Sequence, residues 1–333
     1  MKKAAFFCDG GQDDVNLRRV FDASRRARLE AQVDLYPGVV TARDFEEHAP
    51  RLGDLEVIFA TWGMPVLSPA QFDRLPALRA VFYAAGSVRH FAPPLLERGV
   101  LVVSAWAANA VPVAEFTLAQ ILLANKGYFR NVPEYHGAGH PRSAFRGRGN
   151  FGATVALLGA GQIGRALIEL LRPFRLRVLV FDPFLSREDA ESLGVEKVGL
   201  DDAFARGDVV SNHLANVPAT VGLLHGAHFA AMPANATFIN TGRGATVVEA
   251  DLARVLLARP DLTALLDVTD PEPPAPDSPL WSLPNVHLSS HIAGSLGDEV
   301  ARMADYVLDE FEAWEAGRPL RYAVTPERLE HMA

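Results

Sequence analysis

Short apolar runs alternate with longer amphipathic stretches along the chain. In the first third of the sequence the apolar runs are AAFF (4–7), LEVIFA (55–60), LRAVFYA (78–84) and VLVVSA (100–105). Runs of this length, bounded by polar residues, predict buried strands. Helical patterns lie between them over 14–32 and 68–75, and the second begins with Ser68 as N-cap and Pro69 in the first turn. This alternation is typical of parallel α/β architecture.

The alternation continues through the rest of the chain. A long helical pattern covers 109–129, with Pro112 at a place suited to a first turn. The stripe predicted to face the core consists of Val111, Ala114, Leu118, Ile121, Leu122 and Asn125. The Gly- and Arg-rich stretch 135–152 predicts an exposed loop. From Ala153 six strand-like runs alternate with helices, and a last helix over 297–317 is long enough to return to the first half. We expect an α/β protein with two Rossmann-like, doubly wound parallel-sheet domains.

Composition narrows the classes of function. The chain has 333 residues, more than one hydrophobic core usually holds, which again favours two domains. Its net charge of −8 argues against nucleic-acid binding and against a basic membrane contact. The single cysteine, Cys8, excludes a disulfide framework and a Cys-rich zinc site, and it is expected to be buried. His136 and His140 are separated by glycines, so we expect no metal site.

Nothing in the sequence predicts export or a membrane span. The apolar stretch near the N-terminus ends at Cys8, which is too short for the core of a signal peptide. No later run approaches the roughly 18 apolar residues that cross a bilayer. We therefore expect a soluble cytoplasmic protein.

The most specific local motif is GAGQIG. Gly159, Gly161 and Gly164 follow the strand-like run TVALL and open an amphipathic helix. This arrangement predicts a dinucleotide site, with the pyrophosphate at the helix N-terminus. Asp182 ends the next strand-like run, where a carboxylate accepts hydrogen bonds from the ribose and repels a 2′-phosphate. The alternative is a tight turn without a ligand, but the complete context favours NAD.

Three more polar residues follow strand-like runs in this half. Arg243 follows TFIN, Glu272 follows LLDV and His291 follows VHLSS. In an open parallel sheet the carboxyl ends of the strands line the ligand crevice. An arginine can hold a carboxylate, a histidine can exchange a proton, and a glutamate can orient that histidine. This combination suits the reduction of a keto acid, whereas each residue alone could be a surface ion pair.

The chain resembles the NAD-dependent D-isomer-specific 2-hydroxyacid dehydrogenases over nearly its whole length. The matching stretches are NAVPVAEFTLAQILLANK, LGAGQIGRAL, DVVSNHLANVPATVGLL, FINTGRGATVVEADL, LLDVTDPEP and SSHIAG. The resemblance implies a substrate domain formed by 1–105 and 297–333. It also implies an NAD-binding Rossmann domain, 106–296, inserted into the substrate domain.

The resemblance further implies roles for single residues. Arg243 would bind the substrate carboxylate and carbonyl, Glu272 would be the partner of the catalytic histidine, and His291 would be the acid/base. Asp267 would contact the nicotinamide carboxamide, and Thr241 with the His213 loop would line the cofactor. The substrate would contact Ala85, Gly86, Ser87, Arg243 and His291. The cofactor would contact Gly159, Gly161, Gln162, Ile163, Gly164, Asp182, His213, Thr241, Gly242, Arg243, Asp267, His291 and Gly294.

Two stretches depart from the family pattern. AAGSVRH (84–90) stands where the family commonly has a Gly-rich loop followed by Asp-Asn, and the usual HxP reads His213-Leu214-Ala215. The sequence therefore predicts a homodimeric enzyme that transfers hydride between NAD(H) and a small 2-keto acid/(2R)-hydroxy acid pair. The alternatives are an NAD(H)-sensing binding protein or co-repressor on the same scaffold, and a phosphoglycerate dehydrogenase-like enzyme in which Arg89 and His90 meet the phosphate.

Overall fold

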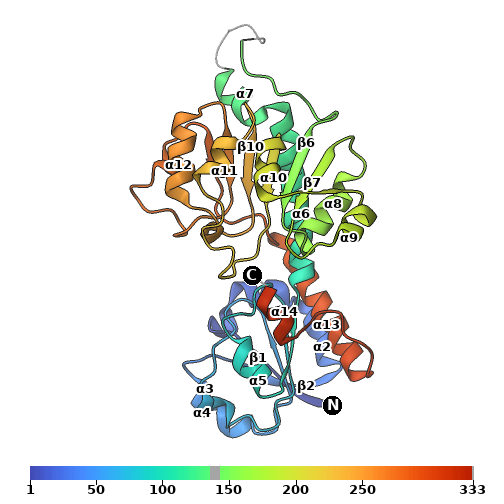
Figure 1. Cartoon of the computed structure of the whole chain (residues 1–333). Coiled ribbons are helices and arrows are strands. Elements are labelled where there is room, and N and C mark those ends of the chain that lie inside the picture. Colours follow the sequence, from blue (N-terminus) through green and yellow to red (C-terminus); the bar gives the residue numbers. More distant parts are fainter. Residues whose placement is uncertain (136–142, 332–333) are drawn as a thin grey trace. The chain divides into compact units, whose positions relative to one another are not determined.

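The computed structural model describes residues 1–135 and 143–331, and the chain divides into two compact units (Figure 1). The first unit contains Met1–Asn109 and Ser295–Ala333, and the second contains Ala110–Gly294. The chain therefore passes into the second unit within one long helix, α6 (Trp106–Lys126), and returns at Gly294–Ser295. The α/β class expected from the sequence is confirmed, since each unit is built around a largely parallel sheet.

The first unit holds a six-stranded sheet in the order β13-β5-β4-β3-β1-β2. Its strands are β1 (Lys2–Phe7), β2 (Val33–Val40), β3 (Val57–Ala60), β4 (Ala80–Tyr83), β5 (Leu101–Ser104) and β13 (Ala323–Val324), and only β13 runs antiparallel to its neighbour. The helices are α1 (Val15–Val20), α2 (Ala23–Glu30), α3 (Phe45–His48), α4 (Pro69–Phe72), α5 (Ala92–Glu97), α13 (Ala301–Glu315) and α14 (Pro326–His331).

The returning helix α13 closes the core of the first unit. Phe311 packs edge-on against Phe59 and Phe82, at 5.3 and 5.4 Å between ring centroids. Arg25 of α2 donates to Asp305 of α13, which ties the two helices together at the surface. Burial of the aromatic cluster explains why the C-terminal segment belongs to this unit.

The second unit holds a seven-stranded, fully parallel sheet in the order β12-β11-β10-β9-β6-β7-β8. The strands are β6 (Thr154–Leu158), β7 (Arg177–Phe181), β8 (Glu196–Lys197), β9 (Val209–Asn212), β10 (Thr237–Asn240), β11 (Thr263–Leu266) and β12 (Val286–Leu288). The helices besides α6 are α7 (Tyr128–Glu134), α8 (Gln162–Leu171), α9 (Arg187–Leu193), α10 (Leu200–Arg206), α11 (Gly226–Ala231) and α12 (Glu249–Ala258).

Helices cover both faces of this sheet. Val155 and Leu157 of β6 pack with residues of α6 and α8, whereas Ala156 and Leu158 pack with residues of α10, α11 and α12. Side chains alternate between the two faces of a strand, so a strand buried on both faces needs the continuous apolar run seen in the sequence. The doubly wound arrangement is thus confirmed for this unit.

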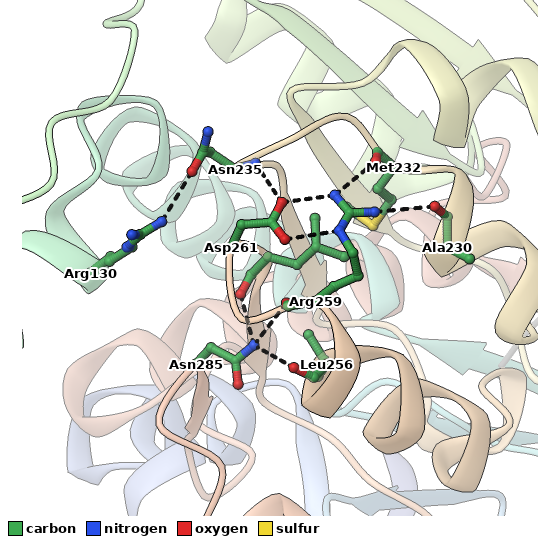
Figure 2. A network of polar contacts seen from close by, with 9 residues as sticks. Arg130, Ala230, Met232, Asn235, Leu256, Arg259, Asp261 and Asn285 are labelled. Carbon is green, nitrogen blue, oxygen red and sulfur yellow. Dashed lines mark hydrogen bonds and ion pairs between the residues drawn. The ribbon is translucent and has the colours of Figure 1, made fainter.

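A polar network lies where β10, β11 and β12 begin (Figure 2). Asp261 accepts two hydrogen bonds from Arg259, both of 2.8 Å, and a third from the backbone N–H of Asn235. Arg130 of α7 donates to the Asn235 amide oxygen, while Asn285 donates to three carbonyls at the end of α12 and the following turn. The network fixes the amino ends of the strands, away from the edge where Arg243, Glu272 and His291 follow them.

Several elements differ from the sequence-based prediction. The single helix expected over 14–32 is two helices, because Asp22 caps α2 through the N–H of Arg25 and Phe21 ends α1. Strand β2 was not expected, because Pro37 and Gly38 interrupt its apolar pattern; it is an edge strand, where proline is tolerated. The two-residue strands β8 and β13 were also not expected.

The long helix begins earlier than its pattern indicated. Pro112 lies inside α6 rather than in its first turn, since the helix starts at Trp106. By length and composition α6 could also cross a membrane, so the expectation that no segment passes that test was wrong. In the second unit Ala114 and Ile121 of this helix are buried in the core beside β6. Cys8 is fully buried, as expected.

Candidate active site

The glycine motif forms the turn between β6 and α8. Gly159 has a φ of +102°, which a residue with a side chain rarely adopts. A Cβ at Gly164 would lie 2.1 Å from the carbonyl oxygen of Gly159, so this glycine is required for the close contact of helix and turn. Gly161 is the N-cap of α8, and a Cβ there would meet no atom within 4 Å among the described residues.

This turn fits a pyrophosphate. The N–H groups of Gln162 and Ile163 begin α8, and no side chain caps the helix. Free N–H groups at a helix start favour an anion, and the open space above Gly161 leaves room for one. The residues present therefore fit a dinucleotide, with Gly161, Gln162 and Ile163 at its phosphates.

Asp182 lies beside the glycine turn, at the end of β7. Its Oδ2 accepts a 2.7 Å hydrogen bond from the N–H of Ala160, and its Oδ1 accepts from the N–H groups of Phe184 and Leu185. The carboxylate thus connects the glycine turn to the turn before α9. Oδ2 accepts only one hydrogen bond and so retains acceptor capacity for a ribose hydroxyl.

His213 follows β9 and belongs to a chain of hydroxyl groups. Its Nε2 lies 3.0 Å from Ser211 Oγ and its Nδ1 lies 3.3 Å from Thr241 Oγ1, which in turn contacts Thr117 of α6. Desolvation lowers the pKa of His213 to about 4. The ring is therefore neutral near pH 7, with one nitrogen donating and the other accepting.

Arg243 follows β10 and projects from a short 3₁₀ turn. Its guanidinium donates a 2.7 Å hydrogen bond to the carbonyl of Gly242. Burial lowers the pKa of Arg243 from its usual value, and the nearby carboxylate of Glu272 opposes this effect. A half-buried guanidinium next to a carboxylate remains charged and has donors left for an anionic ligand.

Glu272 and His291 form a direct pair. His291 Nδ1 lies 2.7 Å from Glu272 Oε1, and both side chains are partly exposed. His291 has a φ of +58°, a left-handed conformation that is uncommon for a residue with a side chain. Such backbone geometry is found preferentially at functional sites, where the surrounding structure enforces it.

Asp267 enforces the conformation around His291. This buried carboxylate accepts hydrogen bonds from Ser289 Oγ and from the N–H groups of Ile292 and Ala293, at 2.6, 2.9 and 2.9 Å. The N–H of His291 also donates to the Asp267 carbonyl. The family resemblance implied that Asp267 contacts the nicotinamide, and within the described chain its hydrogen bonds organise the His291 turn.

The expected substrate loop belongs to the first unit. Hydroxyl groups hold its carbonyls: Thr61 donates to Ala84, and Ser104 donates to Ala85 and Gly86. The N–H groups of Ala85, Gly86 and Ser87 have no hydrogen bond within the described chain. Arg89 donates to the carbonyl of Leu329, in α14.

Other sequence predictions have simple outcomes. His136 and His140 lie outside the described residues. Within the described part of the chain, no group of three His, Cys, Asp or Glu side chains could hold a metal ion. Sequence reasoning missed Asn212, a buried amide beneath the Arg243 turn, although a polar residue at the end of the apolar run DVVSN was a usable signal.

A glycine turn that fits a dinucleotide, an arginine and a Glu–His pair lie at the same edge of one sheet. Together they define the scaffold of a nucleotide-dependent oxidoreductase. Residues 119–293 match the D-isomer specific 2-hydroxyacid dehydrogenase, NAD binding domain. The match covers more than half of the chain, so the protein belongs to this family, and its second unit is an NAD-binding domain.

Curated relatives and a solved structure agree with the family. The chain is 31% identical to a D-3-phosphoglycerate dehydrogenase of Archaeoglobus fulgidus, over 70% of this chain and 44% of the relative. It is 32% identical to an (S)-sulfolactate dehydrogenase of Chromohalobacter salexigens, over 64% of this chain and 69% of the relative. A phosphoglycerate oxidoreductase from Rhizobium etli shares the fold with a TM-score of 0.79 and 26% identity, over 98% and 99% of the two chains. The chain spans about half the length of the phosphoglycerate dehydrogenases it matches, from 42% to 52%.

Proposed function

We propose that the protein is an NAD-dependent dehydrogenase that interconverts a small 2-keto acid and the corresponding (2R)-hydroxy acid. The observation that carries this proposal is the 2.7 Å His291–Glu272 pair, with Arg243 at the end of the neighbouring strand β10. These groups follow β12, β11 and β10, at the edge of the sheet where the glycine turn also lies. Ligands of open parallel sheets bind at this edge.

Arg243 and His291 have different roles in the proposed reaction. Arg243 binds the substrate carboxylate and polarises the carbonyl, which orients the carbonyl carbon for attack. His291 donates a proton from Nε2 to the carbonyl oxygen, because its Nδ1 is engaged by Glu272. NADH supplies the hydride that this carbon receives. The products are the hydroxy acid and NAD⁺, so each reduction consumes one proton, which His291 recovers from solvent.

The loop at 85–87 of the first unit is proposed to contribute backbone N–H groups to substrate binding. Its three N–H groups have no partner in the described chain, and its carbonyls are fixed by Thr61 and Ser104. A rigid set of free N–H groups favours an oxyanion such as a carboxylate.

A phosphoglycerate dehydrogenase-like activity is the second candidate. It is favoured by the relatives that carry this name. The sequence suggested Arg89 and His90 as phosphate ligands, but the Arg89 guanidinium donates to Leu329. A phosphate bound by Arg89 would have to compete with that carbonyl.

The proposal includes a cytoplasmic homodimer. Exposed apolar side chains occur along α6 and α7 and directly after α7: Leu123, Tyr128, Val132 and Tyr135. Exposed apolar side chains in neighbouring segments are expected where a second protein chain packs. Light scattering of the purified protein tests the dimer, and Leu123→Glu is expected to shift it toward monomer.

The test of the activity is a panel of 2-keto acids, from glyoxylate through hydroxypyruvate to phenylpyruvate, with NADH absorbance as the readout. Phosphohydroxypyruvate in the same panel distinguishes the second candidate function, a phosphoglycerate dehydrogenase-like activity, from the first. We expect at least one of these acids to be reduced, and reduction to be lost in His291→Ala. NADH binding without turnover on any of them would favour the NAD(H)-sensing alternative.

A further inference from the structure

The turn that carries Arg243 rests on a buried group of polar side chains. Asn212, Asn240 and Thr246 are each at most 1% exposed, and they come from the end of β9, the end of β10 and the turn after Arg243. Two of them hold the Arg243 carbonyl: Thr246 Oγ1 donates to it at 2.8 Å, and Asn240 Nδ2 donates at 3.3 Å. These two hydrogen bonds therefore fix the backbone of Arg243.

Asn212 connects these two donors. Its Nδ2 donates to Asn240 Oδ1 at 2.9 Å and to Thr246 Oγ1 at 2.8 Å. Its Oδ1 accepts from the N–H of Leu214, so every polar atom of the amide is used. Because Thr246 donates its only proton to Arg243, its oxygen must accept from Asn212, and the direction of this chain of hydrogen bonds is settled.

We propose that Asn212 is a positioning residue that fixes the Arg243 turn in the orientation needed to bind a substrate carboxylate. It acts through Asn240 and Thr246 and does not itself face the ligand, since it is fully buried. Chained hydrogen bonds in a buried site strengthen one another, so loss of the central member loosens both donors to the Arg243 carbonyl. The inference rests on the proposed role of Arg243.

A leucine at this position gives a strong test. Asn212→Leu keeps the approximate volume but removes both donors and the acceptor. It leaves Thr246 Oγ1 and the N–H of Leu214 without these partners in a buried site. A misplacement of the order of 1 Å in a substrate-holding group can reduce catalytic efficiency about 100-fold.

The structure offers a matched control in Asn285. This amide also makes three hydrogen bonds, to the carbonyls of Leu256, Arg259 and Leu262, but it lies in the network at the amino ends of the strands (Figure 2). Asn285→Leu therefore costs stability in the same unit without touching the Arg243 turn. Thr246→Val removes the hydroxyl group that joins Asn212 to the Arg243 carbonyl. It is the test variant to use if Asn212→Leu does not fold.

The first readout does not depend on activity. Hydrogen–deuterium exchange of the peptide covering 240–248 in the free protein is expected to speed up in Asn212→Leu and in Thr246→Val, but not in Asn285→Leu. Unchanged exchange in both turn variants, or the same acceleration in Asn285→Leu, overturns the proposal.

The second readout is binding of oxamate, an unreactive 2-keto acid analogue, to the protein with NADH. We expect Asn212→Leu to weaken oxamate binding about 10- to 100-fold while NADH affinity changes little. The double variant with Thr246→Val is expected to be no worse than the more affected single variant, because both act through one chain. Equal loss of NADH and oxamate binding would indicate general damage and overturn the inference. If the unmodified protein binds no oxamate and reduces none of the 2-keto acids in the panel, the proposed function fails, and the exchange experiment alone decides whether Asn212 fixes the turn.

Discussion

The imidazole of His291 and the carboxylate of Glu272 lie 2.7 Å apart, between Nδ1 and Oε1. The pair is held from two sides, since Glu272 lies in the loop after β11 and the His291 turn is fixed by Asp267. This contact leaves Nε2 of the ring directed away from the glutamate. A carboxylate at this distance accepts the hydrogen bond of Nδ1–H and so orients the ring, with Nε2 available for proton transfer.

Replacing the glutamate by glutamine tests this relationship. Glu272→Gln keeps the size of the side chain but replaces a carboxylate, which can only accept, by an amide, so the hydrogen bond that orients His291 is weakened. We expect kcat/KM for keto-acid reduction to fall about 10-fold, because the ring is less well oriented for proton transfer. The measurement is kcat/KM for keto-acid reduction with saturating NADH.

His291→Ala is the comparison for the same measurement. It removes the proton donor itself, so the loss of kcat/KM is expected to be larger, about 100-fold or more. Unchanged kcat/KM in Glu272→Gln would mean that the glutamate does not orient this histidine.

Arg243 is predicted to serve substrate rather than cofactor. Arg243→Ala is expected to lower kcat/KM for the keto acid about 100-fold, because orientation of the carbonyl is lost, while NADH fluorescence titration remains close to that of the unmodified protein. Arg243→Lys should rescue poorly, because lysine lacks the planar fork. Arg254→Ala, an exposed arginine on α12, is the matched control. If kcat/KM in Arg243→Ala equals that of the unmodified protein, Arg243 does not belong to the active site.

The sequence predicted the parts of the fold that depend on continuous apolar runs. Strands β6, β9, β10 and β11 are buried on both faces, so their patterns are unambiguous. Strand β2 lies at a sheet edge and contains Pro37, so its pattern is broken. The break between α1 and α2 depends on one cap, Asp22, which a periodic pattern does not reveal.

Part of the candidate site could likewise be predicted from the sequence, and part could not. Arg243, Glu272 and His291 could be found from their positions after strands, and the structure places Glu272 and His291 in contact. What sequence could not supply is how their turns are held. The bonds of Asp267 to the N–H groups of Ile292 and Ala293, and the chain from Asn212 to Arg243, join segments distant in sequence and are visible only in the fold.

Asp182 is predicted to make the protein prefer NADH to NADPH. Its carboxylate would face a 2′-phosphate with like charge, so Asp182→Ser should raise kcat/KM with NADPH relative to NADH. The same carboxylate accepts from the N–H groups of Ala160, Phe184 and Leu185, so efficiency with NADH should also fall as the turn loosens. Asp189→Ser, an exposed carboxylate on α9, should change neither value. Equal kcat/KM with both cofactors in the unmodified protein would contradict the assignment.

His213 is predicted to make the protein sensitive to mild acid. Its pKa is lowered to about 4 in the folded state by desolvation, whereas an unfolded histidine has a pKa of about 6.5. Between these values the unfolded state binds the proton and the folded state does not, so the free energy of unfolding falls as the pH falls from about 6.5 to 4. The loss amounts to at most about 2 kcal/mol between pH 6.5 and pH 5.

His213→Gln keeps a hydrogen-bonding side chain without this titration, so its free energy of unfolding should fall less between pH 7 and pH 5, measured by urea unfolding. His90→Gln, at an exposed position, is the control and should keep the slope of the unmodified protein. The same acid sensitivity in His213→Gln would show that another group is responsible.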